Sequence, residues 1–280
     1  MPLMPRDDSP PAAVVFDRVS FAFGEHVILN DISFSVPTGA TWIVLGASGS
    51  GKSIMLKLIL GLLRPDSGRI FVKGDRVDDM PERDLMGVRA DIGMLFQETA
   101  LFDSLSVAEN VGYRLYEETK MPLDEVRARV TEVLGFVGLA DYLDRMPSEL
   151  SGGQRRRVAL ARAMASKPSL LLVDDPTTGL DPITAASVDD EIVKLRDLER
   201  VTSIIVTHQI RDAYYVATHE ARRLPNGDVE LFEADADKTG TAHFMVLHDA
   251  RILFEGTAAG LLESQDAYLK EFLYMTLPPW

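Results

Sequence analysis

The stretch GASGSGKS, residues 46–53, decides the architecture of this chain. It fits the pattern G-x-x-x-x-G-K-[ST], in which glycines let the backbone curl so that its N–H groups point at phosphates. The short apolar run TWIVLG (41–46) precedes it, and KSIMLKLILGLL (52–63), with apolar residues at helical spacing, follows it. A strand, a glycine-rich loop and a helix in this order predict a phosphate-binding loop beside a sheet.

Each residue type in this loop has a chemical task. The Lys52 ammonium is expected to reach the β- and γ-phosphates of a nucleotide, and the Ser53 hydroxyl is expected to ligate Mg²⁺. The remaining phosphate contacts are expected from the rest of the loop: Gly46, Ser48, Gly49, Ser50 and Gly51. The loop therefore predicts a magnesium–nucleotide site.

Strand-like and helix-like segments alternate along the 280 residues, which is typical of an α/β fold with a largely parallel sheet. SLLLVDD (169–175) and TSIIVTH (202–208) are continuous apolar runs, as expected for strands buried on both faces, and each ends on an ionisable residue. DIGMLFQ (91–97) is a further strand. AVVFDRVSFAF and ILNDISFSV alternate apolar and polar residues, which predicts an antiparallel pair near the N-terminus.

The other segments divide the chain into expected units. Residues 98–165 are predicted to form an inserted helical subdomain, because apolar residues recur there at i, i+3 and i+4 without a strand-like run. The polar, Pro-rich residues 1–12 are expected to be a disordered leader. Residues 219–243 are polar and acidic, and Asn226-Gly227 predicts an added surface hairpin there. A helical tail is expected over 259–280.

Composition excludes several classes of function. The net charge is −14, which argues against a nucleic-acid partner, because phosphate backbones are bound by basic faces. The absence of cysteine excludes disulfides, thiol catalysis and Cys-based zinc sites. No run of 18 apolar residues occurs, so we expect the chain to work at a membrane only through a partner.

Two further motifs complete the predicted site. Phosphoryl transfer needs a carboxylate for the metal ion, and Asp174 at the end of SLLLVDD supplies one. LSGGQ (150–154) opens a helix, so that its backbone N–H groups and positive helix end form a second anion cradle. The cradle residues are Ser151, Gly152, Gly153 and Gln154. One chain cannot easily place two cradles around one γ-phosphate, whereas a second copy packed head to tail can.

At this point the chain resembles the ATPase subunits of ABC transporters over roughly residues 13–258. The resemblance rests on GASGSGKS, Gln97 in LFQE, LSGGQ, LLLVDDP, GLDP (179–182) and His208, in the family's order and spacing. It implies the ABC ATPase fold: a P-loop NTPase (RecA-like) core with an antiparallel β subdomain and an inserted α-helical subdomain. It also implies ATP and Mg²⁺ as cofactors and a head-to-tail homodimer.

The resemblance assigns roles to individual residues. Phe23, where the family usually has Tyr, would stack on adenine; its alternative is an ordinary core residue. Gln97 would contact Mg²⁺ and the attacking water and link to the membrane partner, or would be a plain strand-end residue. Asp181 would signal across the dimer, and His208 would contact the γ-phosphate or be structural. Asp175 takes the position of the catalytic base.

Asp175 departs from the family pattern, which has glutamate at this position. One methylene less withdraws the carboxylate by about 1.5 Å, and a misplacement of about 1 Å can cost around a hundredfold in rate. We therefore expect ATP binding to be intact and hydrolysis to be slow. Gln209, where Asp is common, and Ile54, where Thr or Ser is usual, are smaller departures.

A closer resemblance lies in LFQETALFDSLSVAENV (95–111) and MPSELSGGQRRRVALARA (146–163), which are similar to the ATPases of Mla-type lipid transporters. It implies phospholipid transport, a permease, an MCE-type lipid-binding partner, and a peripheral position on the cytoplasmic face of the membrane. The run Arg155–Arg157 is expected to be a solvated helix face rather than a headgroup site. The alternatives are an amino-acid-type importer, a soluble ABC ATPase of translation or DNA maintenance, and a slow or non-hydrolysing ATP-dependent switch.

Overall fold

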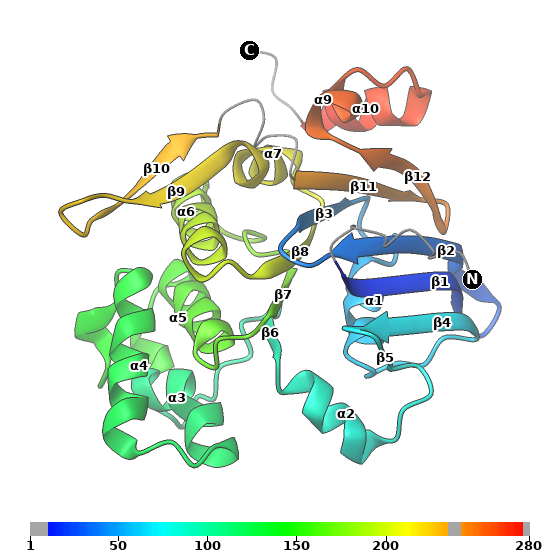
Figure 1. Ribbon diagram of the computed structural model, residues 1–280. Coiled ribbons are helices and arrows are strands. Elements are labelled where there is room, and N and C mark those ends of the chain that lie inside the picture. The colour runs from blue at the N-terminus through cyan, green and yellow to red at the C-terminus, as the bar shows by residue number, and fades with distance from the viewer. Residues whose placement is uncertain (1–10, 235–241, 277–280) are drawn as a thin grey trace, which may run out of the picture.

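The computed structural model describes residues 11–234 and 242–276. A six-stranded sheet in the order β12-β11-β3-β8-β7-β6 runs through the centre of the molecule (Figure 1). From β11 to β6 the neighbouring strands are parallel, and β12 pairs antiparallel with β11. Its strands are β3 (Thr41–Leu45), β6 (Ile92–Leu95), β7 (Leu170–Asp174), β8 (Thr202–Thr207), β11 (Ala242–His248) and β12 (Arg251–Gly256). The loops that follow the parallel strands therefore meet at one edge of the sheet.

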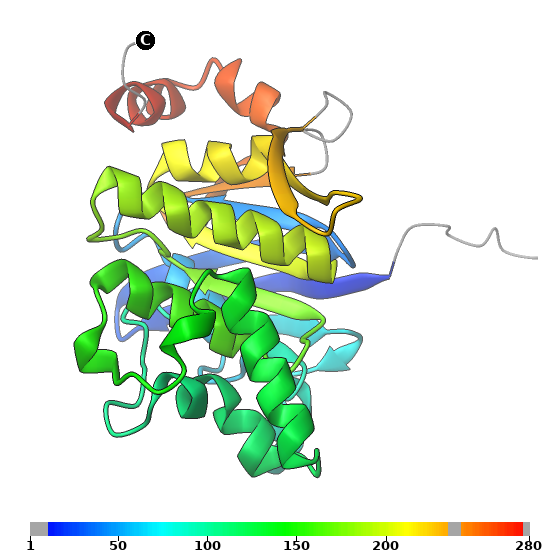
Figure 2. The ribbon, with the colours of Figure 1, turned by 90° about the vertical axis from the view of Figure 1, so that its left-hand side faces the viewer.

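Strands β3, β7 and β8 are buried on both faces, which is why they are continuous apolar runs. Trp42 and Val44 point into a core that they share with α1 (Lys52–Ile59), whereas Ile43 and Leu45 point to the opposite face and pack with α7 (Ile210–Thr218). On that second face α6 (Pro182–Glu199) lies beside α7, as Figure 2 shows. The sheet is thus the middle layer between α1 and the α6–α7 pair.

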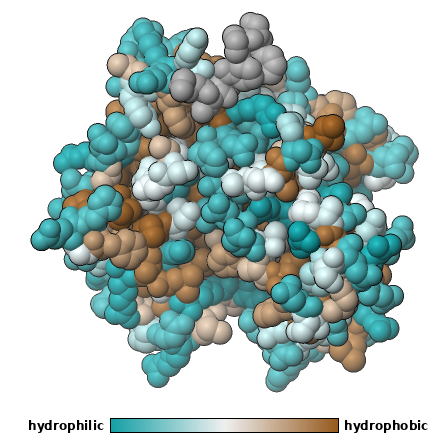
Figure 3. Space-filling view, turned by 180° about the vertical axis from the view of Figure 1, so that it is seen from behind, coloured by the Kyte–Doolittle hydropathy of each residue, from teal (hydrophilic) through white to brown (hydrophobic). Residues whose placement is uncertain are grey.

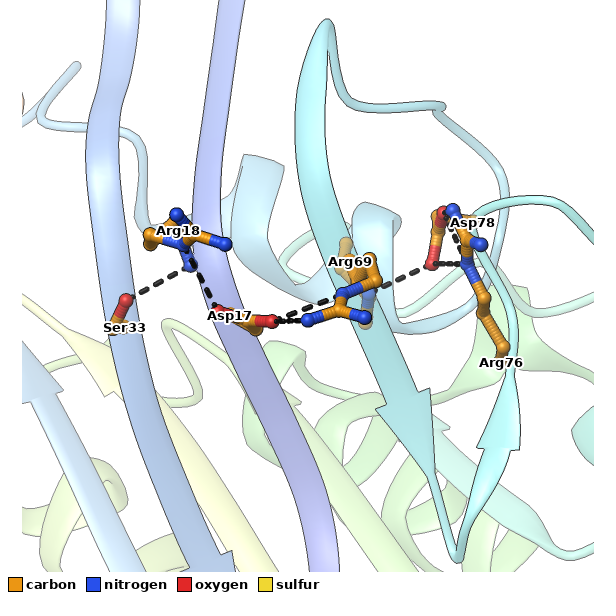
Figure 4. Close-up of polar contacts among 7 residues, drawn as sticks. Asp17, Arg18, Ser33, Arg69, Arg76 and Asp78 are labelled. Atoms are coloured by element: carbon orange, nitrogen blue, oxygen red, sulfur yellow. Dashed lines mark hydrogen bonds and ion pairs between the residues drawn. The ribbon is translucent and has the colours of Figure 1, made fainter.

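An antiparallel sheet in the order β2-β1-β4-β5 packs against the α1 side. Its strands are β1 (Ala12–Phe23), β2 (His26–Pro37), β4 (Ser67–Val72) and β5 (Asp75–Arg76). Polar side chains connect β1, β4 and the segment after β5 (Figure 4): Arg69 Nε donates to Asp17 at 3.0 Å, and Arg76 pairs with the buried Asp78 at 2.8 Å. Asp78 also accepts the backbone N–H of Ile70 at 2.8 Å. These contacts hold β1, β4 and β5 in register.

A group of helices forms a separate part of the fold, at the lower left of Figure 1. It consists of α3 (Val107–Glu118), α4 (Leu123–Phe136), the 3₁₀ turns at Ala140–Tyr142 and Pro147–Glu149, and α5 (Gly152–Met164). Together with the mixed sheet this arrangement confirms the predicted fold class, while the subdomain boundaries stay a prediction. Helix α2 (Glu82–Arg89) was not predicted, because Leu85 is its one fully buried residue and leaves no apolar periodicity.

The C-terminal third adds a small hairpin and two short helices. Strands β9 (His219–Arg223) and β10 (Val229–Glu233) pair antiparallel beside α6, whose Asp197 accepts the N–H of Ala221 at 2.8 Å. Helices α9 (Ala258–Leu262) and α10 (Ala267–Thr276) lie above β11 and β12 in Figure 1. The predicted leader over 1–12 falls outside the described residues except at its last two positions, and parts of the 219–243 and 259–280 predictions do so too.

The surface seen from behind mixes hydrophilic side chains with several separate hydrophobic areas (Figure 3). Within residues 11–234 and 242–276, none of the helices has the length and hydrophobicity needed to cross a membrane.

Candidate active site

The phosphate loop joins β3 to α1, and the side chain of Lys52 at the start of α1 folds back onto it. Lys52 Nζ donates to the carbonyl oxygens of Gly46 at 2.8 Å and Ala47 at 3.0 Å, so its side chain folds back over the loop. Gly51 has φ +100°, and a Cβ there would lie 2.9 Å from Leu29 Cδ2, so the position requires glycine. Burial lowers the pKa of Lys52, and the carboxylates of Asp175 and Asp174 partly oppose this effect. The ammonium is therefore held close to the loop and to both aspartates.

A hydroxyl and a carboxylate meet where a metal ion is expected. Ser53 Oγ donates to Asp174 Oδ1 at 2.8 Å, and Asp174 is 7% exposed. Burial raises the pKa of Asp174. Mg²⁺ is commonly held by one or two carboxylates, a hydroxyl, waters and substrate phosphates, so this pair fits it. No cluster of three or more His, Asp or Glu suited to a metal occurs in the described part of the chain.

The Ser50 hydroxyl is a second feature that suits a bound nucleotide. Its Oγ is buried and makes no hydrogen bond within the described residues, whereas buried hydroxyls are normally paired. An unpaired donor inside a glycine-rich loop is suited to a phosphate oxygen. The loop and the Ser53–Asp174 pair together have the chemistry of a magnesium–nucleotide site.

Asp175 and His208 face each other at the ends of β7 and β8. Asp175 Oδ1 lies 2.9 Å from His208 Nδ1 and also accepts the His208 backbone N–H at 3.2 Å. An ionised carboxylate only accepts hydrogen bonds, so Nδ1 carries the proton in this contact. The Asp175 backbone has φ +42°, a left-handed conformation that aspartate tolerates better than most residues, and its N–H donates to Val206 O at 2.8 Å. The structure thus brings these two predicted residues together.

Phe23 and Gln97 both have exposed side chains. Phe23 is 56% exposed at the end of β1 and packs edge-on against Phe21 at 4.9 Å, so it does not belong to the core. Gln97 follows β6 and is exposed; within the described residues its side chain makes no hydrogen bond, while its carbonyl oxygen accepts from Arg156. Both side chains are free to approach a ligand.

The SGGQ segment begins α5 and is not hydrogen-bonded to the phosphate loop within the described residues. Ser151 and Gln154 cap each other, with Ser151 N donating to Gln154 Oε1 at 2.8 Å and Gln154 N to Ser151 Oγ at 3.2 Å. Ser151 and Gly152 are exposed. A Cβ on Gly153 would lie 2.2 Å from Thr184 Cγ2, so close packing on α6 requires glycine there.

Asp181 caps α6. Its Oδ1 accepts the N–H groups of Ile183 and Thr184, both at 3.1 Å, and its Oδ2 accepts the Thr184 hydroxyl at 2.5 Å. The Thr184 hydroxyl and these backbone donors lower the pKa of Asp181. Asp181 is exposed, so it remains accessible to a second molecule although it caps a helix of its own chain.

Arg156 corrects one prediction, because the Arg155–Arg157 run is not simply a solvated face. Arg156 is 6% exposed and donates to the carbonyl oxygens of Phe96 and Thr178, both at 3.3 Å, as well as to that of Gln97. It therefore ties α5 to the loops that follow β6 and β7. Arg156 lies three or four residues from Gly153 and Leu160, and with Ala163 these residues form one buried face of α5. This helical spacing could have predicted that Arg156 is buried.

Comparison with known proteins decides the family. A sequence model of the ABC transporter family matches residues 29–178. This chain belongs to the ABC transporter ATP-binding family. The intermembrane phospholipid transport system ATP-binding protein MlaF of Haemophilus influenzae is 35% identical over 256 residues, which cover 91% of this chain and 88% of that protein. The ABC ATPase family hydrolyses ATP, and its ATPases dimerise and pair with membrane permeases.

Other relatives differ in what they transport. The sulfate/thiosulfate import ATP-binding protein CysA of Synechococcus elongatus is 43% identical over 214 residues, or 76% of this chain. This ABC ATPase spans 60% of the length of CysA and 59% of that of another 43% identical relative. The solved ATP-binding cassette MJ0796, a dimer in a post-hydrolysis state bound to ADP and Pi, superposes with a TM-score of 0.71. It is 29% identical, and the match covers 87% of this chain and 98% of the cassette.

A buried acid on α6 predicts a pH-dependent stability. Asp189 is 2% exposed; burial, together with the charge of Asp212, raises its pKa to about 8. Between pH 4 and 8 the folded state then holds a proton that the unfolded state has lost, so stability falls with rising pH by up to about 1.4 kcal/mol per unit. We expect Asp189→Asn to match the native unfolding temperature near pH 4 and to exceed it at pH 8. Parallel pH profiles for the two proteins would contradict this, and the exposed Asp103→Asn is the control.

Proposed function

We propose that this ABC ATPase drives a phospholipid transporter, with ATP-dependent closure of its homodimer coupled to a permease. The observation that carries the proposal is the Ser53–Asp174 hydrogen bond of 2.8 Å, which places two magnesium ligands beside Lys52 and the phosphate loop. A site of this composition suits Mg-ATP. We assign binding of the transported molecule to the partner subunits.

The proposed roles are those that the family resemblance implies for these side chains. Phe23 stacks on adenine, Lys52 and the loop backbone bind the phosphates, and Ser53, Asp174 and Gln97 hold Mg²⁺, which neutralises phosphate charge when bound. Asp175 polarises the attacking water as general base. His208, bound to Asp175 at 2.9 Å, contacts the γ-phosphate.

A second copy of the chain supplies the remaining cradle. Ser151 and Gly152 are exposed at the N-terminus of α5 and make no hydrogen bond to the phosphate loop of their own chain within the described residues. In a head-to-tail homodimer they meet the partner's nucleotide, and Asp181 contacts the partner across the interface. The cassette MJ0796, which superposes on this chain, is a dimer. We place the dimer on the cytoplasmic face of the membrane, bound to an integral permease and to an MCE-type lipid-binding protein.

Phospholipid is the proposed cargo because the MlaF relative matches nearly the full length of the chain, 91%, whereas the match to CysA covers 76%. ATP hydrolysis by the chain purified together with its permease provides the test. We expect phospholipid vesicles to stimulate hydrolysis several-fold, and sulfate or amino acids, each with a matching binding protein, to have no effect. Stimulation by sulfate or by an amino acid instead would replace the lipid assignment.

A second candidate function is a slow or non-hydrolysing ATP-dependent switch. It is favoured by the two hydrogen bonds that Asp175 Oδ1 already accepts from His208, at 2.9 and 3.2 Å. Because these hydrogen bonds already use its Oδ1, the short Asp175 carboxylate is poorly placed to polarise a water molecule. Binding of ATP without measurable turnover, in the presence of the permease, would favour this second function.

A further inference from the structure

A buried threonine links the two loops that carry Asp175 and His208. Thr177 is 1% exposed and lies in the loop after β7. Its Oγ1 donates to Asp212 Oδ2 at 2.5 Å and accepts from Gln209 Nε2 at 3.0 Å. Gln209 directly follows His208, and Asp212 lies in the first turn of α7. One hydroxyl thus connects the loop after β7 to the start of α7.

The direction of these hydrogen bonds is fixed by chemistry. A hydroxyl has one hydrogen to donate, and Asp212, whose Oδ1 accepts from Arg211 Nε at 3.0 Å, is an acceptor. The Thr177 hydroxyl hydrogen is therefore donated to Asp212. Toward residue 209 the Thr177 oxygen can only accept a hydrogen bond, through its lone pairs. A carboxamide offers a donor to those lone pairs, whereas a carboxylate offers none. Glutamine at 209 and an acid at 212 are consequently a matched pair.

The pair sits immediately beside the Asp175–His208 contact. Thr177 is two residues beyond Asp175, and Leu180 N donates to Thr177 O at 3.1 Å, so the same loop leads on to Asp181. On the other side, the Gln209 backbone N–H donates to Thr207 Oγ1 at 3.0 Å. A shift of Thr177 relative to Gln209 would therefore move Asp175 relative to His208.

We propose that Gln209 and Asp212 are positioning residues for ATP hydrolysis, acting through the Thr177 hydroxyl to hold the 175–181 loop against His208. The role rests on the proposed function, in which Asp175 and His208 act on the nucleotide. It also accounts for Gln209, which stands where the family commonly has aspartate. A carboxylate there would face the lone pairs of Thr177 and the buried charge of Asp212.

The test is a reversal of the hydrogen-bond direction. In Gln209→Glu two carboxylates compete for the single hydrogen of the Thr177 hydroxyl, and we expect kcat to fall about tenfold or more. The KM for ATP is expected to stay within about twofold of native, because the phosphate loop is unchanged. In the double variant Gln209→Glu/Asp212→Asn, Thr177 donates to Glu and accepts from Asn. We expect the added Asp212→Asn change to restore kcat to within about threefold of native.

Two controls separate positioning from general damage. Gln265→Glu makes the same chemical change on an exposed residue and is expected to leave kcat unchanged. Thr177→Ser, which keeps the hydroxyl, is expected to retain kcat, whereas Thr177→Val is expected to lose it and to gain nothing from Asp212→Asn. If Gln209→Glu keeps the native kcat, or if the double variant shows no rescue, the positioning role of Gln209 and Asp212 is overturned. The hydrolytic function of the protein is not affected by either result. Absence of hydrolysis in the native protein, with or without its permease, would instead overturn the hydrolytic function and this role with it.

Discussion

Replacing Lys52 with alanine is expected to lower kcat for ATP hydrolysis by a factor of about a thousand or more. Lys52 Nζ is buried in the phosphate loop and lies 2.8 Å from Gly46 O, where it is poised to neutralise the β- and γ-phosphates. Its removal also leaves Asp174 and Asp175, 7% and 8% exposed, without the cation between them and the loop. The loss therefore acts on charge stabilisation in the transition state and on nucleotide binding together.

Steady-state phosphate release measures this effect, with Lys57→Ala as the matched control. Lys57 lies on the same helix α1 but is exposed, so its removal is expected to change kcat by less than about twofold. Unfolding temperatures of both variants show whether the fold is intact. Comparable hydrolysis by Lys52→Ala and native protein would mean that the measured phosphate comes from a contaminating ATPase or a different site.

Much of the site could be predicted because its residues follow parallel strands. SLLLVDD and TSIIVTH are buried on both faces, so their apolar runs mark β7 and β8 to within one residue at each end. The carboxyl ends of parallel strands share one edge, which is why Asp174 and His208, 34 positions apart, could be expected close to the phosphate loop. The loop pattern itself located Lys52 and Ser53.

What the sequence could not supply was the direction in which side chains point. The Asp175–His208 contact depends on a backbone φ of +42° at Asp175, and no pattern in VDDPTTGLDP encodes that angle. The burial of Arg156 depends on loop carbonyls contributed by Phe96 and Thr178, which are distant in the sequence. The Thr177–Asp212 hydrogen bond likewise joins residues 35 positions apart. Such contacts are tertiary, and local periodicity carries no information about them.

Lengthening Asp175 to glutamate is expected to raise kcat by about ten- to a hundredfold. In the native protein Asp175 Oδ1 is held by His208 Nδ1 at 2.9 Å and by the His208 N–H at 3.2 Å, so the short carboxylate is turned toward β8. An added methylene extends the carboxylate by about 1.5 Å, and a displacement of about 1 Å near the reacting atoms is worth around a hundredfold. Glutamate at this position is expected to reach the attacking water and to polarise it more strongly than aspartate does.

Single-turnover and steady-state hydrolysis of Asp175→Glu distinguish two meanings of the native aspartate. A gain in both rates that disappears in Lys52→Ala/Asp175→Glu would show that the aspartate slows a site that is otherwise complete, and the protein then works as a slow timer unless its permease moves the loop. A fall in both rates would show that the loop, with its left-handed backbone at Asp175, is built around the shorter side chain. The aspartate would then be the accommodated base, because a glutamate placed on that backbone overshoots the water and displaces His208. Asp103→Glu, the same change at an exposed residue, is the control for both readings.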